Sequence, residues 1–300
     1  MLDLFRIFAD VLFPVFGIAA IGFVAARRWR IPYEALSTIA YRILTPAFIF
    51  RILSDPAGFD GPIAKMMATS LGTVVVVWAL MTLRLRRQSG ERRTLDAMAS
   101  TFGNVGNLGF PIVLFGLGER SLAPASIHFL SVTIGAFVIG VSMAARLRSG
   151  TVGDAIKRVA LTPAIAVTPF ALVASRAEWA PPEALARLIG LLADAMIPVM
   201  LLTLGIQLAS SRLAAGWRRL GFITVAKLVV SPTVFLAVAA LIGLEGVAHD
   251  SGFVLAAMPT AVLVGLIGLE FDLETEVASA AILVTSVVAM GTLSVVLTLV

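Results

Sequence analysis

The sequence contains no cysteine, which excludes disulfide bonds, thiolate metal sites and cysteine nucleophiles. It has two histidines, His128 and His249, too few for a histidine zinc site, and we expect neither a metal nor a cofactor. Charged residues are also scarce, at 14% of the chain, where a soluble domain has about 25%. With 59% hydrophobic residues and a mean hydropathy of +0.99, the composition predicts an integral membrane protein.

The chain is rich in long runs of apolar residues. About ten of them approach 20 residues, the length of a helix that crosses a hydrocarbon core of about 30 Å. We therefore expect an all-α fold of ten transmembrane helices surrounded by the lipid bilayer. The expected spans are 5–26, 34–53, 63–83, 95–118, 124–146, 156–176, 185–209, 219–243, 251–269 and 277–299.

The net charge of +5 is explained by topology and does not indicate a nucleic-acid partner. Most Lys and Arg residues fall in one set of alternate connections: 27–30, 84–93, 146–158 and 212–219. Cytoplasmic loops retain Lys and Arg, so this side is expected to be cytoplasmic. With ten spans, both termini then lie on the outer, periplasmic side of what we expect to be a bacterial inner membrane.

Prolines recur at a separation of about half the chain. The matched pairs are Pro14 and Pro163, Pro32 and Pro181, Pro46 and Pro198, and Pro111 and Pro259. Proline inside a helix is costly, so a repeated placement predicts two repeated halves, 1–150 and 151–300. Five spans per half is an odd number, so the second half is inserted upside down. Such inverted repeats are typical of secondary transporters.

The fourth and ninth spans each contain a break. The first is the polar, glycine-rich stretch 103–111, and the second surrounds Met258-Pro259-Thr260. In lipid, a broken helix persists only where it is buried in protein or lines a wet cavity. Paired breaks in two halves indicate the binding site of a transporter. The predicted substrate-binding residues are Asn104, Asn107, Gly109, Pro111, Pro259 and Thr260.

The breaks also predict the charge of the ligand. We expect the first half-helix to resume at Pro111 and the second at Pro259 or Thr260, with both N-termini facing the bilayer centre. Each N-terminus carries free N–H groups and about half a positive charge, which suits a carboxylate without a buried Arg or Lys. The simpler alternative is that Gly103, Gly106 and Gly109 form a stripe for close helix packing.

At this point the chain resembles the auxin efflux carrier family. The resemblance is carried by Asn104-Val-Gly-Asn107-Leu-Gly109-Phe-Pro111, with support from residues 257–260, Pro46 and the run 197–208. It implies ten helices in an inverted repeat like that of the bile acid:sodium symporters, with helices 4 and 9 crossing. It also implies a scaffold domain of helices 1, 2, 6 and 7, a transport domain of helices 3–5 and 8–10, elevator-type alternating access and a homodimer.

One departure from the family bears on the substrate. Many relatives have a polar residue shortly after the helix 9 proline, whereas residues 261–266 here are apolar or glycine. The substrate expected from the resemblance is a small organic anion, either a malonate-like acid or an auxin-like aromatic acid. The apolar run leaves room for a monocarboxylate with an apolar or aromatic body.

Five residues inside the spans, where polar groups are costly, are further candidates for coupling or for the substrate path. Arg42 and Asp194 occupy equivalent places in the two halves, so they either pair, line the substrate path, or reach water or a dimer contact. Lys227 either extends to the interface or serves as an anion-attracting or proton-responsive charge. His128 is either proton-responsive or interfacial, and Thr285 faces the crossover or its own helix.

The leading interpretation is a secondary carrier of an organic anion. The alternative within transport is a sodium-coupled or cation-exchanging carrier with another substrate. No acidic residue lies in 102–111 or 257–268, which disfavours proton–cation antiport but leaves sodium or proton coupling open. An intramembrane enzyme is disfavoured because neither G-x-S-x-G nor H-E-x-x-H occurs. A non-transporting sensor would leave the two breaks without a purpose.

Overall fold

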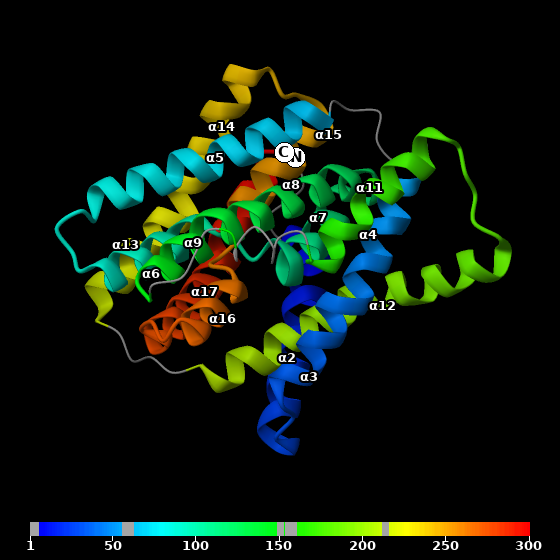
Figure 1. Ribbon diagram of the computed structural model, residues 1–300. Helices are drawn as coiled ribbons and strands as arrows, with labels where there is room; N and C mark the ends of the chain where they lie inside the picture. The colour runs from blue at the N-terminus through cyan, green and yellow to red at the C-terminus, as the bar shows by residue number, and fades with distance from the viewer. Residues whose placement is uncertain (1–5, 56–62, 149–152, 154–160, 212–215) are drawn as a thin grey trace.

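The computed structural model describes residues 6–55, 63–148, 153, 161–211 and 216–300. Within these residues the fold is helical, and its one β-type pairing is an isolated bridge. Figure 1 shows the arrangement of the helices. The elements are η1 Ile7–Leu12, α2 Phe13–Trp29, α3 Tyr33–Ile39, η2 Ala40–Leu44, α4 Thr45–Ser54, α5 Ile63–Arg84, α6 Gly90–Thr101, η3 Val105–Gly109, α7 Phe110–Leu117, η4 Glu119–Ser121, α8 Leu122–Gly135, η5 Ala136–Val141, α9 Ser142–Arg146, α11 Pro163–Arg176, α12 Glu183–Ser210, α13 Trp217–Val225, η6 Ala226–Val230, α14 Ser231–Ile242, α15 Gly246–Ala256, α16 Val262–Glu270 and α17 Thr275–Thr298.

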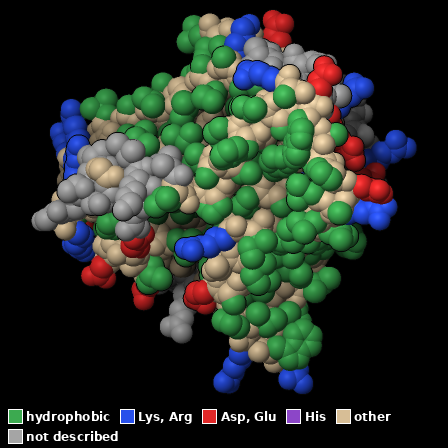
Figure 2. Space-filling model, turned by 45° about the vertical axis from the view of Figure 1, so that its right-hand side comes forward, with side chains coloured by type: hydrophobic (Ala, Val, Ile, Leu, Met, Phe, Trp, Pro, Cys, Tyr) green, Lys and Arg blue, Asp and Glu red, His purple; other side chains and the backbone are tan. Residues whose placement is uncertain are grey.

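Seven helices of the described residues are long and apolar enough to cross a membrane. Two shorter apolar helices, Val105–Leu117 and Pro163–Arg176, accompany them. The face in Figure 2 carries a broad area of hydrophobic side chains, with most charged side chains toward its margins. Large apolar side chains such as Leu191 and Leu241 are exposed by 74% and 86%. Such a surface fits lipid, so the expectation of an integral membrane helical protein is confirmed.

The helices form two groups. The first, called here the α12 group, contains η1–α2, α3–η2–α4, α11 and α12, with α12 packed along α2 and α4. The second, called here the crossover group, contains α5–α9 and α13–α17, with α5 packed on α6, α8 and α14. In Figure 1 the labels of the α12 group lie on the right and below, and α5, α6, α13, α14, α16 and α17 lie on the left.

Glycines bring α2 and α12 into backbone contact. A Cβ atom on Gly205 would lie 1.8 Å from the Ala19 carbonyl oxygen, and one on Gly22 would lie 2.3 Å from that of Leu202. No side chain fits at either distance, so the two helices cross at their backbones. In lipid, where helices gain little from hydrophobic burial against each other, such close contact is a main source of association. It makes the α12 group a tightly joined unit.

Four of the described π-helical segments precede a proline. η1, η2, η3 and η6 end two residues before Pro14, Pro46, Pro111 and Pro232. In each case the residue directly before the proline donates its N–H to the carbonyl five residues back, as Phe110 does to Val105. A proline ring clashes with the carbonyl four residues earlier, and the wider turn gives it room. Prolines therefore shape these helices without ending them.

Candidate functional site

The two expected breaks lie against each other. α6 ends at Thr101 and helix resumes at Val105, while α15 ends at Ala256 and α16 begins at Val262. Gly103 and Thr260 form an antiparallel β-bridge between the breaks. The Asn104 N–H donates to the Pro259 carbonyl at 2.7 Å, and the Ala261 N–H donates to the Phe102 carbonyl at 2.8 Å. Each unwound segment thus satisfies backbone groups of the other, as a low-dielectric interior requires. We call residues 102–104 and 257–261 the crossover.

Two helix starts expected from the sequence are wrong. The first half-helix does not start at Pro111: η3 and α7 form one helix from Val105 to Leu117, and Pro111 lies inside it after a π turn. Asn104 is the middle residue of a tight turn, with φ −76° and ψ 60° and a 2.8 Å bond from the Val105 N–H to the Gly103 carbonyl. The second half-helix starts at Val262, two to three residues after the expected point, because Pro259 and Thr260 are used in the bridge.

Threonines complete the crossover. The Thr260 hydroxyl donates to the Ala99 carbonyl at 2.8 Å, so it caps the last turn of α6. The Thr260 N–H donates to the Thr285 hydroxyl oxygen at 3.0 Å. That hydroxyl in turn donates to the Ala281 carbonyl of its own helix at 2.7 Å. The two interpretations of Thr285 left open by the sequence are therefore both met by one side chain. All of these groups are buried, so each unpaired atom would carry a desolvation cost.

A cavity of about 740 Å³ opens from one side of the crossover. Its inner end is formed by Gly103, Asn104 and Gly106 at the first break and by Ala261 and Val262 at the second. These residues belong to the first turns of the two half-helices or directly precede them, so the free N–H groups of both helix ends lie along the cavity. We call this side the cavity face of the crossover.

The cavity wall is largely apolar and partly aromatic, and its wider end is exposed. The apolar lining is contributed by Tyr41, Phe129, Val132, Phe137, Leu263, Leu266 and Ile267. Six lining residues are exposed and mark the opening, and they include charges of both signs: Glu34, Thr38, Arg42, Leu161, Leu266 and Glu270. Size and lining are those of a small-molecule site, which typically has apolar walls and a few placed polar groups.

The two asparagines differ in their roles. Asn104 lines the cavity and is 3% exposed, and its Nδ2 has no hydrogen-bond partner in the structure. Asn107 is fully buried one turn into the half-helix, where its Oδ1 accepts a 2.8 Å hydrogen bond from the Tyr41 hydroxyl. Its own Nδ2 is also unpartnered. A buried amide without a partner is costly, and of these two unpartnered amides the one of Asn104 belongs to a residue that lines the cavity.

Gly109 and Pro111 lie further along the half-helix and outside the cavity lining. A Cβ on Gly109 would lie 2.6 Å from Leu255 Cδ2, so this glycine allows the half-helix to pack against α15. A Cβ on Gly106 would lie 3.3 Å from Phe129. Packing, the simpler alternative given for the glycine stripe, therefore describes Gly109, whereas Gly103 and Gly106 border the cavity.

Arg42 and Asp194 do not pair. Asp194 forms an ion pair with Arg51, at 2.5 Å between Oδ1 and the guanidinium nitrogen, which ties α12 to α4. Arg42 lies on η2 and lines the cavity, and within the described residues it has no ion-pair partner. Arg42 and Asp194 are equivalent in the sequence repeat, but Asp194 pairs with Arg51, which lies nine residues after Arg42 along the chain. Arg42 is exposed and lines the cavity, so two alternatives stay open for it: a residue of the substrate path, and a side chain that reaches water or a dimer contact.

Lys227 lies at the crossover, so the expectation that its side chain extends to the interface is wrong. The residue is 1% exposed. Its Nζ donates to the Ala256 carbonyl, the last of α15, at 2.8 Å and to the Ser231 hydroxyl at 3.3 Å. A Cβ on Gly103 would lie 3.3 Å from Nζ. A buried lysine amine therefore lies beside the crossover, contrary to the expectation of a site without a buried Arg or Lys.

Lys227 also borders a small chamber of about 10 Å³ whose lining residues are buried or half-buried. This chamber lies at the C-terminal ends of α6 and α15, represented by Thr101 and Ala256. Its polar lining consists of Ser70, Thr73, Thr101, His128, Lys227 and Ser231. We call this side the lysine face of the crossover.

His128 is not interfacial, because it is 3% exposed and its Nδ1 lies 2.9 Å from the Ser70 hydroxyl. Its ring also packs edge-on against that of Phe235. His128 therefore belongs to the buried polar cluster on the lysine face. The sequence predicted that His128 lies near the start of a helix. In the structure α8 begins at Leu122, more than one turn before His128, and α5 packs against α8.

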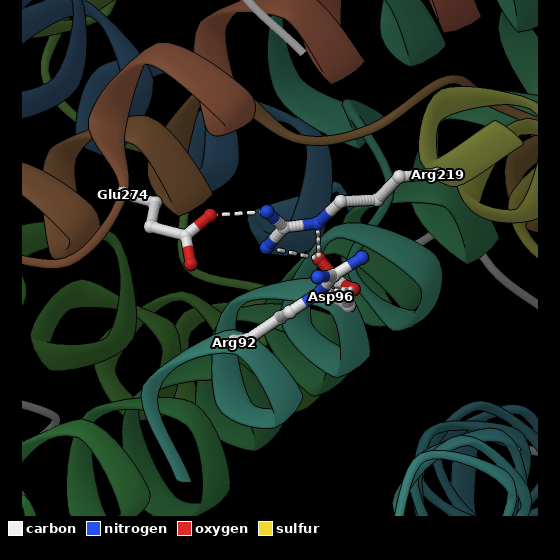
Figure 3. A network of polar contacts seen from close by, with 4 residues as sticks. All are labelled: Arg92, Asp96, Arg219 and Glu274. Carbon is white, nitrogen blue, oxygen red and sulfur yellow. Dashed lines mark hydrogen bonds and ion pairs between the residues drawn. The ribbon is translucent and has the colours of Figure 1, made fainter. Parts of the chain in front are cut away.

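An ion-pair network joins three elements of the crossover group (Figure 3). Arg219 on α13 donates from Nε to Asp96 of α6 at 2.7 Å and also pairs with Glu274, which precedes α17. Arg92 lies 3.9 Å from the other Asp96 oxygen. The Asp96 side chain is 1% exposed, so its carboxylate is removed from water and depends on these arginines as partners. The network thereby connects α6 to α13 and to the residue before α17. The ion pair between Arg219 and Asp96 was not predicted from the sequence, although Asp96 is the one acidic residue inside the expected span 95–118.

Tyr41 was also missed. Among hydrogen bonds and ion pairs between described residues, its bond to Asn107 is the one side-chain interaction that joins the α12 group to the crossover group. Inter-helix ion pairs of described residues all stay within one group, as Arg51 with Asp194 and Arg219 with Asp96 do. A tyrosine inside an apolar span was the available signal.

The amino-acid sequence of this chain is similar to those of known membrane transport proteins. Residues 7–139 and 170–297 match the model of a family described as "Membrane transport protein". The chain is 30% identical over 297 residues to a Rhizobium meliloti protein named "Putative malonate transporter", covering 95% of this chain and 93% of that one. It is 23% identical over 268 residues to an "Uncharacterized transporter" of Methanothermobacter thermautotrophicus, covering 87% and 86%. The matches confirm the family resemblance seen in the sequence: the chain belongs to the membrane transport protein family.

Proposed function

We propose that this protein is a secondary carrier of a small carboxylate, which binds on the cavity face of the crossover. The observation that carries the proposal is the unpartnered Asn104 amide at the inner end of a cavity of about 740 Å³. The free N–H groups of two half-helices lie beside it, starting at Val105 and Val262. Preorganised donors and two positive helix ends suit a carboxylate group.

Two carboxylate types fit different observations. The relative named for malonate favours a malonate-like acid. The aromatic wall of Tyr41, Phe129 and Phe137 favours a monocarboxylate with an aromatic body, such as an auxin-like acid. In both, the carboxylate is held at Asn104 and the half-helix ends, and the remainder of the substrate faces the wall.

The proposed transport mechanism is alternating access by movement of the crossover group against the α12 group, with the first as transport domain and the second as scaffold. The support is that ion pairs stay within each group and that one side-chain hydrogen bond, from Tyr41 to Asn107, joins the two. A sliding interface needs few polar bonds across it, since each must break in every cycle. We further propose the ten-helix inverted repeat and the homodimer that the family resemblance implies.

The orientation follows from the position of the basic connections. The exposed end of the cavity is marked by Glu34 and Glu270, which neighbour the connections expected to be cytoplasmic. We therefore assign the structure to an inward-open state in the inner membrane, with both termini on the outer side.

The proposal is tested by thermal unfolding of the detergent-purified protein with a panel that includes malonate, succinate, benzoate and indole-3-acetate. A ligand that binds the folded state raises the melting temperature in a saturable way. We expect one carboxylate class to do so, and expect Asn104→Ala to abolish the shift. The matched control is Gln207→Ala, which removes a carboxamide from α12 outside the cavity lining and should keep the shift. Absence of a shift with every carboxylate would reject the proposal.

A further inference from the structure

The lysine face of the crossover gathers negative helix ends. α6 and α15 both finish there, at Thr101 and Ala256, and their last carbonyls have no partners within their own helices. Each helix end carries about half a negative charge. In carriers with broken helices, such ends and the unwound carbonyls beside them are where a coupling cation is coordinated. The negative helix ends on this face therefore favour a positive charge.

The chain supplies that charge from its own side chain. Lys227 Nζ lies 2.8 Å from the Ala256 carbonyl, and the ammonium borders Gly103 of the bridge. The polar groups that share the chamber with Lys227 are four neutral hydroxyls, those of Ser70, Thr73, Thr101 and Ser231. His128 is the one other titratable residue in the chamber lining. No Asp or Glu is among the residues that line this chamber.

The buried Lys227 amine has no carboxylate partner and is held by the Ala256 carbonyl and the Ser231 hydroxyl. Burial of an unpaired charge is otherwise costly, so the position of Lys227 is explained if the two helix ends need it as much as it needs them. A second cation in the same chamber would be repelled at a separation of a few ångströms in a low-dielectric environment. The chamber also has space for no more than one water molecule.

We infer that Lys227 is a built-in cation that occupies the position of a coupling sodium ion, so that this carrier neither binds nor needs sodium. The inference rests on the proposed carrier function, because only a carrier has a coupling ion. It goes further than that function by deciding between the coupling schemes that the sequence left open. It also predicts that removal of the lysine side chain creates a sodium site, since carbonyl oxygens and hydroxyls would then border an empty space.

The test is the melting temperature of the purified protein in NaCl, KCl and choline chloride at equal ionic strength. For the unmodified chain we expect the same melting temperature in all three salts. For Lys227→Ala we expect a lower melting temperature in choline and a saturable rise with sodium. Lys227→Met fills the space with an apolar chain of similar length, so it should lose stability without gaining a sodium response.

The matched control is Lys65→Ala. Lys65 Nζ also donates to a carbonyl at a helix end, that of Gly243 after α14, at 3.0 Å, but it is exposed. Removal of an exposed lysine leaves its carbonyl to water, so no sodium response is expected. A sodium response in this variant would show that the salt effect does not come from the crossover and would overturn the inference.

Two further results would overturn it. One is a sodium-specific rise in melting temperature for the unmodified chain. The other is a folded Lys227→Ala protein whose melting temperature is the same in the three salts. If Lys227→Ala yields no folded protein, the unmodified chain decides, because a sodium response contradicts the inference and its absence supports it. The carboxylate panel is read separately. A chain that binds a carboxylate and also responds to sodium would overturn the inference alone, whereas a chain that binds no carboxylate would reject the proposed function on which the inference rests.

Discussion

The cavity face and the lysine face of the crossover lie a few residues apart and carry opposite electrical ends of the same broken helices. On the cavity face, half-helices begin at Val105 and Val262 and leave N–H groups free. On the lysine face, α6 and α15 end, and the ammonium of Lys227 meets the carbonyl of Ala256. A helix break therefore places a positive and a negative helix end on opposite faces without ionised residues. On the lysine face the negative end is occupied by Lys227, whereas the positive ends border an open cavity.

The bridge between Gly103 and Thr260 is the partition. Gly103 borders both spaces, and a Cβ there would lie 3.2 Å from Lys227 Cε. The side chains on the two faces can therefore be changed separately.

Asn104→Asp should have the largest effect, because it reverses the character of the cavity face. A carboxylate in place of the amide repels an anionic substrate, and we expect affinity to fall on the order of 100-fold, or about 2.7 kcal/mol. Stability without ligand should be unchanged or higher, since an acidic residue directly before a helix is favourable. Calorimetric titration and thermal unfolding measure the two effects. Gln207→Glu on α12 is the control, and equal carboxylate affinity in Asn104→Asp would contradict the assignment.

Thr260→Val should weaken the partition itself. The substitution keeps the shape but removes the hydroxyl that donates to the Ala99 carbonyl, which leaves a buried acceptor unpaired. We expect the free energy of unfolding to fall by about 2 kcal/mol. Thr233→Val is the matched control, because that hydroxyl bonds within its own helix at an exposed position. If both variants melt at the same temperature, the hydroxyl of Thr260 does not stabilise the crossover.

Tyr41→Phe should loosen the bond between the two helix groups. Loss of the hydroxyl leaves Asn107 Oδ1 without a donor and weakens the observed state by about 1 kcal/mol. Since the chain has no cysteine, Thr133→Cys in the cavity wall gives a single labelling site. We expect slower labelling from the cytoplasmic side in the Tyr41→Phe background.

The control for this labelling experiment is Tyr33→Phe. Tyr33 is the other tyrosine of the chain, it lines the same cavity, and its hydroxyl has no partner. Its removal should leave the labelling rate unchanged. Equal rates for Tyr41→Phe, Tyr33→Phe and the parent would show that the bond from Tyr41 to Asn107 does not favour this state.

Arg42→Gln should have the smallest effect, since Arg42 lies at the exposed end of the cavity, away from the crossover. We expect KM for the carboxylate to rise by about two- to threefold with kcat unchanged, and this difference to vanish at high salt as exposed charges are screened. Arg42→Lys should retain most of the effect of the charge. A loss of kcat that persists at high salt would place Arg42 in the binding site itself.

Sequence alone predicted the membrane environment, the helical fold and the place of both breaks. The expected spans 63–83, 185–209 and 277–299 agree with α5, α12 and α17 to within two residues. These features depend on runs of apolar residues and on local interruptions, which are properties of neighbouring residues. The same local pattern, an asparagine among glycines in an apolar span, singled out Asn104, which lines the cavity and whose role in binding stays a prediction.

Helix boundaries at the breaks were decided by tertiary contacts. Pro111 suggested a helix start, but a π turn accommodates its ring within a helix that begins at Val105. Pro259 and Thr260 looked like a helix start as well, but their backbone groups pair with the other break across more than 150 residues of sequence. A backbone group takes whichever partner the fold brings near, and the sequence does not state which one that is.

The partners of the charged residues were likewise decided only in three dimensions. Asp194 took Arg51 in place of Arg42, and Lys227 took a helix-end carbonyl in place of the lipid interface. Repeat position predicts which residues are equivalent but not where a long side chain ends. Composition and periodicity determined that this chain folds in a bilayer around two broken helices. Tertiary structure decided which face of the break received the cation, because the energy of a buried charge depends on every dipole within a few ångströms of it.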